Sequence, residues 1–225
     1  MSNMKIVLSS RNKKKIAELR TIFDLSGLKG IELLSLNEIK VFDDTEENGM
    51  SFEENSLIKA AVPASRGYIG IADDSGLCVD ALDGAPGIFS ARYAGVESND
   101  QLNNIKLLND LRLSEFQDRS ARFVCVVSCV IPARIGLNME VPPEYDVSEL
   151  FPDIVGDSKA FCVRGECPGF ILDEPMGKNG FGYDPLFYIP EKHKTFAQLL
   201  PDEKNEISHR GNAMRKFVDV LKRII

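Results

Sequence analysis

The chain has 225 residues, and its apolar content of 44% is sufficient for one large domain or two small lobes. Its 27 basic and 34 acidic residues give a formal charge of −7, which argues against a general nucleic-acid-binding or anionic-membrane-binding protein. No stretch approaches the roughly 20 apolar residues that a membrane-spanning helix requires. The chain has an odd number of cysteines, 5 in all, and we find no secretory leader. We therefore expect a reduced, cytoplasmic protein.

The first third of the chain alternates strand and helix patterns. Residues 4–9 predict a strand, and apolar residues at helical spacing follow it until Gly27 provides a stop. A second strand is expected over residues 31–36. Alternation of this kind favours a mixed α/β fold.

A polar turn, residues 10–15, lies between the first strand and the helix expected after it. Backbone N–H groups and the positive end of a helix are able to bind phosphate there, and Lys15 adds a cation. A solvated surface is the competing interpretation of the three consecutive lysines. The chain lacks the Gly-x-x-x-x-Gly-Lys-Ser/Thr pattern of a P-loop, which argues against ordinary kinase or GTPase chemistry.

A second helix is predicted after the acidic loop that contains Glu47. Ser51 and Glu54 have the spacing of a capping box at its start, and Pro63 should end or bend it. The apolar run 68–72 then predicts a buried strand.

Two adjacent carboxylates, Asp73 and Asp74, directly follow this predicted strand. The carboxyl ends of strands are where open α/β sheets bind their ligands. Successive strand side chains point to opposite faces, so we expect one aspartate to face a ligand and the other to support it. Which of the two would act as a base stays open, and a cap or turn role is the alternative for either.

The second half of the chain begins with one more helix and then becomes rich in strands. The expected helix places Leu102, Ile105, Leu108 and Leu111 on one face. Three strand-like runs follow, at residues 123–131, 161–163 and 170–172, and the final helix carries Ala213, Phe217, Val220, Leu221 and Ile224 on one stripe. The proline-containing residues 132–158 are interpreted as an insertion that forms a lid, a dimer element or a disordered loop.

Five ordered sequence blocks resemble the Ham1/inosine triphosphate pyrophosphatase family, which acts on non-canonical purine nucleoside triphosphates. The blocks span nearly the whole chain, and they are Ser10-Arg11-Asn12-Lys13-Lys14-Lys15, Ser51–Ala60, Ala72-Asp73-Asp74-Ser75-Gly76 with Pro86-Gly87 and Ser90–Tyr93, Gly180-Phe181-Gly182-Tyr183-Asp184-Pro185, and Ser208-His209-Arg210.

The resemblance implies a fold, an activity and an assembly. The fold would be one pyrophosphatase domain over residues 1–225, an elongated mixed-sheet α/β structure with two lobes flanking a central cleft. The activity would be Mg²⁺-dependent hydrolysis of ITP, dITP and XTP to the nucleoside monophosphate and pyrophosphate. The partners would be a nucleoside triphosphate substrate and a second copy of the chain in a homodimer, with neither nucleic acid nor a membrane.

The same resemblance assigns residues to the phosphate and metal sites. Ser10, Asn12 and Lys15 would hold phosphate, although Ser10 stands where a Thr is more usual and Arg11 where a Gly is frequent. Glu47 and Asp74 match the metal-binding positions, and sparse ligation of this kind suits Mg²⁺. The implied catalytic set is Asp74, Asp73 and Lys59, with Asp74 orienting or deprotonating water.

Residues of the last third match the family's base-recognition positions. Flanking glycines allow Phe181 to stack on a purine. Hydrogen-bond donors near the end of the chain suit the 6-keto oxygen of hypoxanthine or xanthine, whereas an adenine amino group would leave buried groups unpaired, a rejection that reaches about 10⁴-fold. The implied substrate contacts are Ser75, Phe181, Gly182, Tyr183, Asp184, Lys204, His209 and Arg210.

Two other functions remain open at this stage. One is a Maf-like pyrophosphatase of modified pyrimidine nucleotides, which the Phe181 loop and the Ser208-His209-Arg210 ending argue against. The other is a non-catalytic nucleotide-binding protein, against which the complete set of acids and lysine counts.

Overall fold

The computed structural model describes residues 4–11, 16–17, 20–21, 23–24, 27–43, 45–95, 99–136 and 139–225. Its strands are β1 Met4–Leu8, β2 Ile31–Ser35, β3 Ile69–Val79, β4 Ser120–Ile131, β5 Lys159–Ile171, β6 Phe187–Ile189 and β7 Lys194–Thr195. Its α-helices are α2 Phe52–Ser65, α3 Asp100–Leu113, α4 Ala133–Gly136, α5 Pro152–Val155, α6 Pro201–Ile207 and α7 His209–Ile224. Short 3₁₀ helices are η1 Asp80–Leu82, η2 Gly87–Arg92, η3 Pro190–Lys192 and η4 Phe196–Gln198.

The strands form one mixed sheet in the order β2-β1-β3-β4-β5-β6-β7. β1 pairs in parallel with both β2 and β3, whereas β6 pairs antiparallel with β5 and β7. The prediction of a mixed α/β fold is therefore confirmed. None of the helices in the described part of the chain combines the length and apolar character needed to cross a membrane.

The chain divides into two compact units that share the long strands. The first unit comprises Met1–Asp74, Val126–Arg164 and Ala213–Ile225, and the second comprises Ser75–Cys125 and Gly165–Asn212. β3 therefore contributes Asp74 to the first unit and the next residue, Ser75, to the second.

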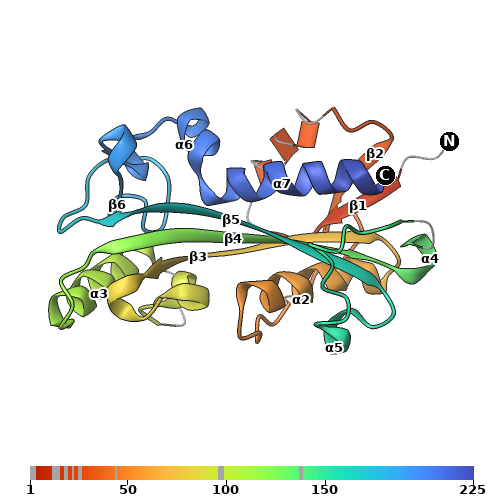
Figure 1. Cartoon of the computed structure of the whole chain (residues 1–225), viewed down its shortest axis with the longest axis horizontal. Coiled ribbons are helices and arrows are strands. Elements are labelled where there is room, and N and C mark those ends of the chain that lie inside the picture. Colours follow the sequence, from red (N-terminus) through yellow and green to blue (C-terminus); the bar gives the residue numbers. More distant parts are fainter. Residues whose placement is uncertain are drawn as a thin grey trace. The chain divides into compact units, whose positions relative to one another are not determined.

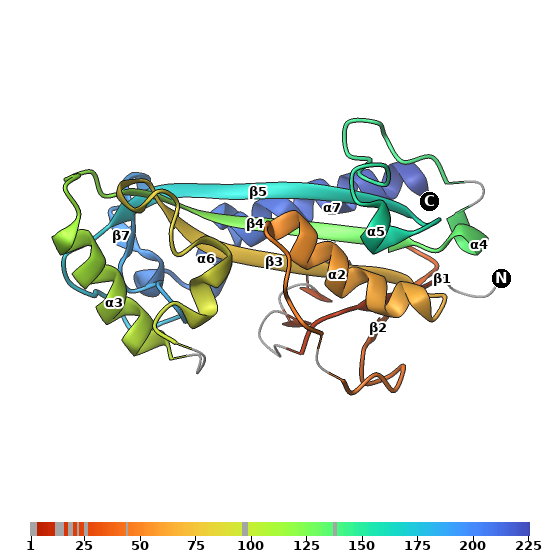
Figure 2. The same cartoon turned by 90° about the horizontal axis from the view of Figure 1, so that it is seen from below.

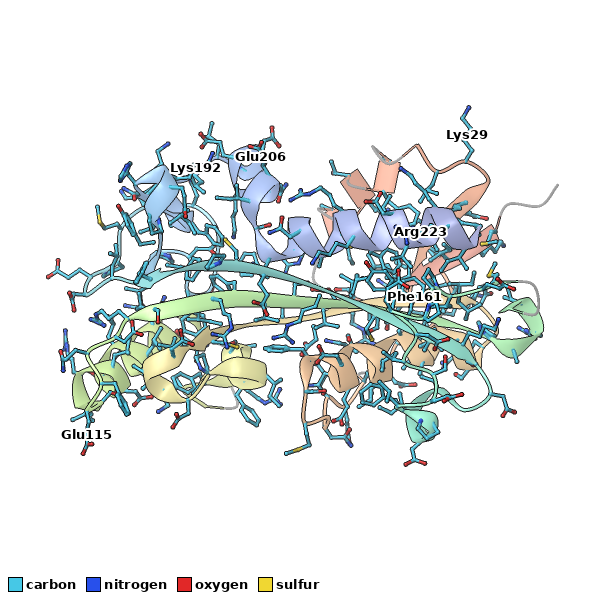
Figure 3. All side chains as sticks on the ribbon, in the orientation of Figure 1. Lys29, Glu115, Phe161, Lys192, Glu206 and Arg223 are labelled. Atoms are coloured by element: carbon cyan, nitrogen blue, oxygen red, sulfur yellow. The ribbon has the colours of Figure 1, made fainter. Side chains whose placement is uncertain are left out.

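In the first unit, helices cover both faces of the sheet. Figure 1 shows α7 on one face and α2 with α5 on the other, and the turned view in Figure 2 agrees. Adjacent residues of β5 serve the two faces: Phe161 stacks on Phe217 of α7 with ring centroids 5.3 Å apart, while Ala160 packs in the cluster of α2 and α5. The side chain of Phe161 accordingly lies between the sheet and α7 in Figure 3. The apolar stripe predicted for the last helix is confirmed, since all five of its members are buried.

The segment predicted as an insertion, residues 132–158, packs within the first unit over its described part. α5 contacts α2, and Val155 is buried in their shared cluster. A backbone hydrogen bond of 3.0 Å from Val147 to Ala160 ties the segment to the start of β5.

The core of the second unit surrounds Phe123 of β4. The centroid of its ring lies 4.6 Å from the ring centroid of Phe187 and 5.7 Å from that of Phe196. Leu107 and Leu111 of α3 are buried in the same cluster. The face predicted for this helix is therefore partly wrong, because Leu102 is 52% exposed and Ile105 is 48% exposed.

Several strand and helix bounds differ from the sequence predictions. β3 does not stop at Ala72 but continues to Val79, so the paired aspartates lie inside a strand. The two short runs at 161–163 and 170–172 are parts of one strand, β5. Pro63 was expected to end or bend α2, and the helix ends shortly after it, at Ser65. The helix expected before Gly27 falls largely outside the described residues, although residues 16–17, 20–21 and 23–24 are helical.

Candidate active site

The first unit holds a cluster of one lysine and two carboxylates. Lys59, from the middle of α2, places its Nζ 2.8 Å from Oδ1 of Asp74 and 3.3 Å from Oε1 of Glu47. The side chains of Lys59 and Asp74 are only 12% and 10% exposed, whereas Glu47 is 36% exposed. The structure thus brings together three of the predicted catalytic and metal-binding residues.

The charge state of Lys59 follows from two opposing effects. Burial disfavours the charged ammonium, but the nearby carboxylates of Asp74, Asp73 and Glu47 outweigh it and raise the pKa of Lys59. The lysine is therefore a fixed positive charge at neutral pH, suited to neutralising an anion and unsuited to acting as a general base.

Both aspartates of the pair are buried within β3. Counted over the whole residue, Asp73 is 3% exposed and Asp74 is 7% exposed. Because they are consecutive strand residues, their side chains leave the sheet on opposite faces, and Asp74 is the one that bonds to Lys59.

The turn after β1 belongs to the same unit as this cluster. The backbone N–H of Ser9 donates to the carbonyl of Ile71 at 2.7 Å, which continues the β1–β3 pairing to the residue before Ser10. A guanidinium nitrogen of Arg11 donates to the carbonyl of Asp43 in the acidic loop. Of the three predicted phosphate contacts, Ser10 lies in this turn, whereas Asn12 and Lys15 lie outside the described residues.

The loop that carries Glu47 is held by the start of α2. Oδ1 of Asn55 accepts the Gly49 N–H at 2.9 Å, and the carboxylate of Glu54 accepts the Met50 N–H. Ser51 caps the helix by accepting the Glu54 N–H at 3.1 Å, as predicted. The prediction of the reciprocal half of the capping box was wrong, because the Glu54 carboxylate accepts the backbone N–H of Met50 and not that of Ser51.

Replacing Asn55 with alanine should lower the free energy of unfolding by about 1–3 kcal/mol. Asn55 is only 1% exposed, and without its side chain the Gly49 N–H has no acceptor in this partly buried position. Urea denaturation at pH 7 measures the change. Asn109→Ala is the matched control, because Asn109 is an exposed residue of α3 and should change the value by no more than about 0.5 kcal/mol. Equal effects of the two substitutions would contradict the role given to Asn55.

The second unit holds a buried ion pair beside aromatic rings. Nζ of Lys204 lies 2.6 Å from Oδ2 of Asp184, and the latter residue is 2% exposed. The same ammonium lies 5.0 Å from the ring centroid of Phe181 and 5.1 Å from that of Phe196. Phe196 was not predicted as a site residue, since nothing in its local sequence distinguishes it from an ordinary core aromatic.

Asp184 also organises the loop that contains Phe181. Its Oδ2 accepts the Phe181 N–H at 2.9 Å. Burial raises the pKa of Asp184, and Lys204, the Phe181 N–H and Arg210 oppose that effect. The ion pair with Lys204 therefore stabilises the charged form of this carboxylate against the effect of burial.

The other predicted base-site residues are also buried in the second unit. Arg210 is 4% exposed and donates to Oγ of Ser75 at 3.2 Å. The ring of His209 stacks on Phe123 at 4.8 Å between centroids. The Tyr183 hydroxyl donates to the carbonyl of Ser90 at 2.8 Å, so this group is engaged with the backbone.

The carboxylate pair of Glu47 and Asp74 in the first unit is a candidate site for a metal ion. Among the described residues no group of three or more His, Cys, Asp or Glu side chains is arranged to hold a metal. Glu47 and Asp74, however, already share one cation, the Lys59 ammonium, and two carboxylates with water and substrate phosphates are typical ligands of Mg²⁺.

These features define an α/β protein with a carboxylate–lysine cluster drawn from one helix, one strand and one loop, and with a buried Lys–Asp pair among aromatic rings. The chain belongs to the Ham1 family, whose sequence model matches residues 6–220.

Relatives and solved structures agree with this assignment over nearly the whole chain. The chain is 43% identical over 228 residues to a dITP/XTP pyrophosphatase of Clostridium perfringens, with 98% of each chain covered. It is 42% identical over 219 residues to a dITP/XTP pyrophosphatase of Bacillus cereus, covering 96% of this chain and 95% of the relative. The structure of a HAM1 protein from Coxiella burnetii matches with a TM-score of 0.81 and 39% identity, covering 97% of this chain and 98% of that one.

Proposed function

We propose that this protein hydrolyses the non-canonical purine nucleoside triphosphates ITP, dITP and XTP to the nucleoside monophosphate and pyrophosphate. The observation that carries the proposal is the Lys59–Asp74–Glu47 cluster, with distances of 2.8 Å and 3.3 Å from the ammonium to the two carboxylates. The names of the relatives, dITP/XTP pyrophosphatase, support the substrate class.

In this proposal Glu47 and Asp74 hold the metal, which we take to be Mg²⁺. When bound, the ion would supply charge neutralisation on the phosphate oxygens. The chemistry of the donor set supports this assignment, because both residues offer hard carboxylate oxygens and Asp74 lies in the middle of the buried strand β3.

Asp74 and other residues of the first unit would also act on the attacking water and the phosphate chain. Asp74 would orient or deprotonate the water that attacks the α-phosphoryl group, and Asp73 would support its geometry. Lys59, whose pKa is raised by its carboxylate neighbours against burial, would neutralise charge that develops on the phosphates. Ser10, Asn12 and Lys15 would bind the outer phosphates.

The second unit would recognise the purine base. Phe181 would stack on the ring, and Lys204, His209 and Arg210 would offer donors to the 6-keto oxygen. Ser75, Gly182, Tyr183 and Asp184 would complete and position this set. Donors in these positions disfavour adenine because its 6-amino group is also a donor.

We further propose a cytoplasmic homodimer that uses residues 1–225 as one functional domain. All five cysteines are free, which supports a reducing compartment. The formal charge of −7 supports a small-molecule substrate over nucleic acid.

The test incubates purified protein and Mg²⁺ separately with ITP, dITP, XTP, ATP, GTP and dUTP and resolves the products chromatographically. Monophosphate plus pyrophosphate from the inosine and xanthosine nucleotides alone is the expected result. A preference for pyrimidine nucleotides would replace the proposal with a Maf-like activity, and binding without turnover would replace it with a nucleotide-binding role. Release of diphosphate products would also contradict it.

Replacing Arg210 with alanine should reduce the selectivity for ITP over ATP. Loss of a charged donor to the 6-keto oxygen should lower kcat/KM for ITP by about 10-fold to 100-fold, because a hydrogen bond to a charged group contributes about 1.5–3 kcal/mol. kcat/KM for ATP should change much less.

Arg122→Ala is the control for this substitution, since the side chain of Arg122 is 40% exposed in the same unit and pairs with Asp80 at 2.6 Å. An equal loss for ITP and ATP in the Arg210 variant would assign Arg210 to phosphate binding or to folding. Thermal melting of both variants identifies the folding case.

A further inference from the structure

The backbone of Gly182 is held at both of its polar groups by helix α3. Its N–H donates to Oδ2 of Asp100 at 2.7 Å, and its carbonyl accepts a hydrogen bond from Nδ2 of Asn104 at 3.0 Å. Asp100 and Asn104 are four residues apart and therefore lie on one face of the helix. They lie 82 and 78 positions from Gly182 in the sequence, so no local pattern links them to it.

These two bonds complete the restraint of the loop that carries Phe181. The preceding N–H, that of Phe181, donates to Asp184 at 2.9 Å, so two consecutive N–H groups are each bound by a carboxylate. Gly182 has a positive φ of 60°, and a Cβ added at Gly180 would overlap the Asp184 carboxylate. The loop conformation is thus a tight one that depends on its hydrogen-bond partners.

Helix α3 is itself fixed and is able to act as a rigid support. Leu107 and Leu111 are buried in the core of the second unit. Asn103, which is 2% exposed, accepts the Ala94 N–H at 2.8 Å and donates to the carbonyl of Ala91 at 3.1 Å. The first turns of the helix, where Asp100 and Asn104 lie, are therefore anchored independently of the Gly182 contacts.

We propose that Asp100 and Asn104 are positioning residues for base recognition: through the Gly182 peptide they hold the ring of Phe181 in its stacking orientation before the nucleotide binds. This inference rests on the proposed function, because it deepens the role of the Phe181 loop. A loop that is ordered in advance does not lose conformational freedom on binding, and that saving appears as affinity for the base. Neither side chain is needed for the water or the phosphates, so the chemical step keeps its rate.

The kinetic test uses Asp100→Ala and Asn104→Ala, with Asp100→Asn as the conservative variant. Each alanine variant should raise KM for ITP by about 5-fold to 20-fold with kcat unchanged within twofold, as expected where ground-state and transition-state binding are lost equally. Asp100→Asn keeps an oxygen acceptor for the Gly182 N–H and should restore most of the affinity. Inhibition constants should separate in the same way, rising for IMP and staying constant for inorganic pyrophosphate.

Asp110→Asn is the matched control. Asp110 is another carboxylate of α3, but it bonds to Tyr93 at 2.5 Å and to Lys106 at 2.9 Å and has no contact with Gly182 among the interactions of the described residues. Its KM for ITP should equal that of the wild type. An unchanged KM in both alanine variants, or an equal rise for IMP and pyrophosphate, would overturn the inference.

Amide hydrogen exchange of residues 180–184 tests the loop independently of any activity. Exchange should be faster in both alanine variants and unchanged in Asp110→Asn. Oδ1 of Asn104 is buried without a hydrogen-bond partner among the described residues, so Asn104→Ala also removes an unsatisfied group and should leave the melting temperature close to that of the wild type. If the wild type fails to cleave ITP, the proposed function falls while this exchange result still decides the role of α3; unchanged exchange overturns the inference in either case.

Discussion

Replacing Asp74 with asparagine should lower kcat for ITP hydrolysis by about 10²–10⁴-fold, the range expected when a positioned acid–base group or metal ligand is lost. The substitution is nearly isosteric; it removes the negative charge that lies 2.8 Å from Lys59 and replaces one carboxylate oxygen with an NH2 group. Steady-state rates at saturating Mg²⁺ and ITP measure the effect. Residual turnover within threefold of the wild type would exclude Asp74 from the catalytic set.

The structure provides a control for the loss of one aspartate charge. Asp80 follows β3 directly, is 45% exposed and pairs with Arg122 at 2.6 Å, so Asp80→Asn removes a similar ion pair outside the proposed site. It should leave kcat unchanged because neither Asp80 nor Arg122 belongs to the proposed site, and an exposed pair should change stability by only about 0–1 kcal/mol. Circular dichroism melting should show both variants folded, since Lys59 retains Glu47 at 3.3 Å when Asp74 is neutralised.

The sequence was sufficient for predicting the types of the main elements because their apolar periodicity is strong. The stripe on the last helix and the strand at residues 123–131 are examples, and both are buried as predicted. Strand lengths were predicted less well. Gly165, Pro168 and Gly169 lie inside β5 and would break an isolated strand, but pairing with neighbours in the sheet overrides that local preference.

The orientation of α3 shows what periodicity alone does not contain. Leu102 and Ile105 suggested the buried face, yet the helix buries Asn103, Leu107 and Leu111. Asn103 is buried because it bonds to the backbone of the preceding loop, at Ala91 and Ala94. A polar side chain that satisfies distant backbone groups leaves no hydrophobic signal, so Leu102 and Ile105 were placed on the buried face wrongly, whereas Leu111 was placed there correctly.

For the candidate site, too, local sequence predicts the residues but not the contacts between them. Individual site residues were predicted from short motifs, but their pairings are contacts between distant elements. Lys59 of α2 and Asp74 of β3 are 15 positions apart, and Asp184 and Lys204 are 20 positions apart. Motifs identify which residues are present, whereas only the packed structure shows that Lys59 bonds to Asp74 while Asp73 faces the opposite side of the strand.

Replacing Lys204 with methionine should lower the free energy of unfolding by about 3–5 kcal/mol near neutral pH, since it leaves a buried carboxylate without its cation. Asp184 is 2% exposed, and its pKa is already raised by burial even with Lys204 only 2.6 Å away. Lys194→Met is the matched control, because Lys194 is 45% exposed and lies 3.9 Å from Glu203. That control should change stability by about 0–1 kcal/mol.

The deficit of the Lys204 variant should depend on pH in a direction set by Asp184. Without Lys204 the pKa of Asp184 in the folded state rises further above its unfolded value of about 3.9, so the folded protein binds more protons than the unfolded chain between the two values. The stability contributed by the protonated carboxyl is fully present below the unfolded pKa and is lost as pH rises through the folded pKa. Urea denaturation should therefore show a smaller deficit relative to the wild type at pH 5 than at pH 8.

The double variant Asp184→Asn/Lys204→Met removes both charges and keeps an acceptor for the Phe181 N–H, so it should be more stable than Lys204→Met at pH 8 and lose this pH dependence. A deficit that is equal at both pH values, or a double variant no more stable than the single one, would show that the buried charge of Asp184 is not its cause.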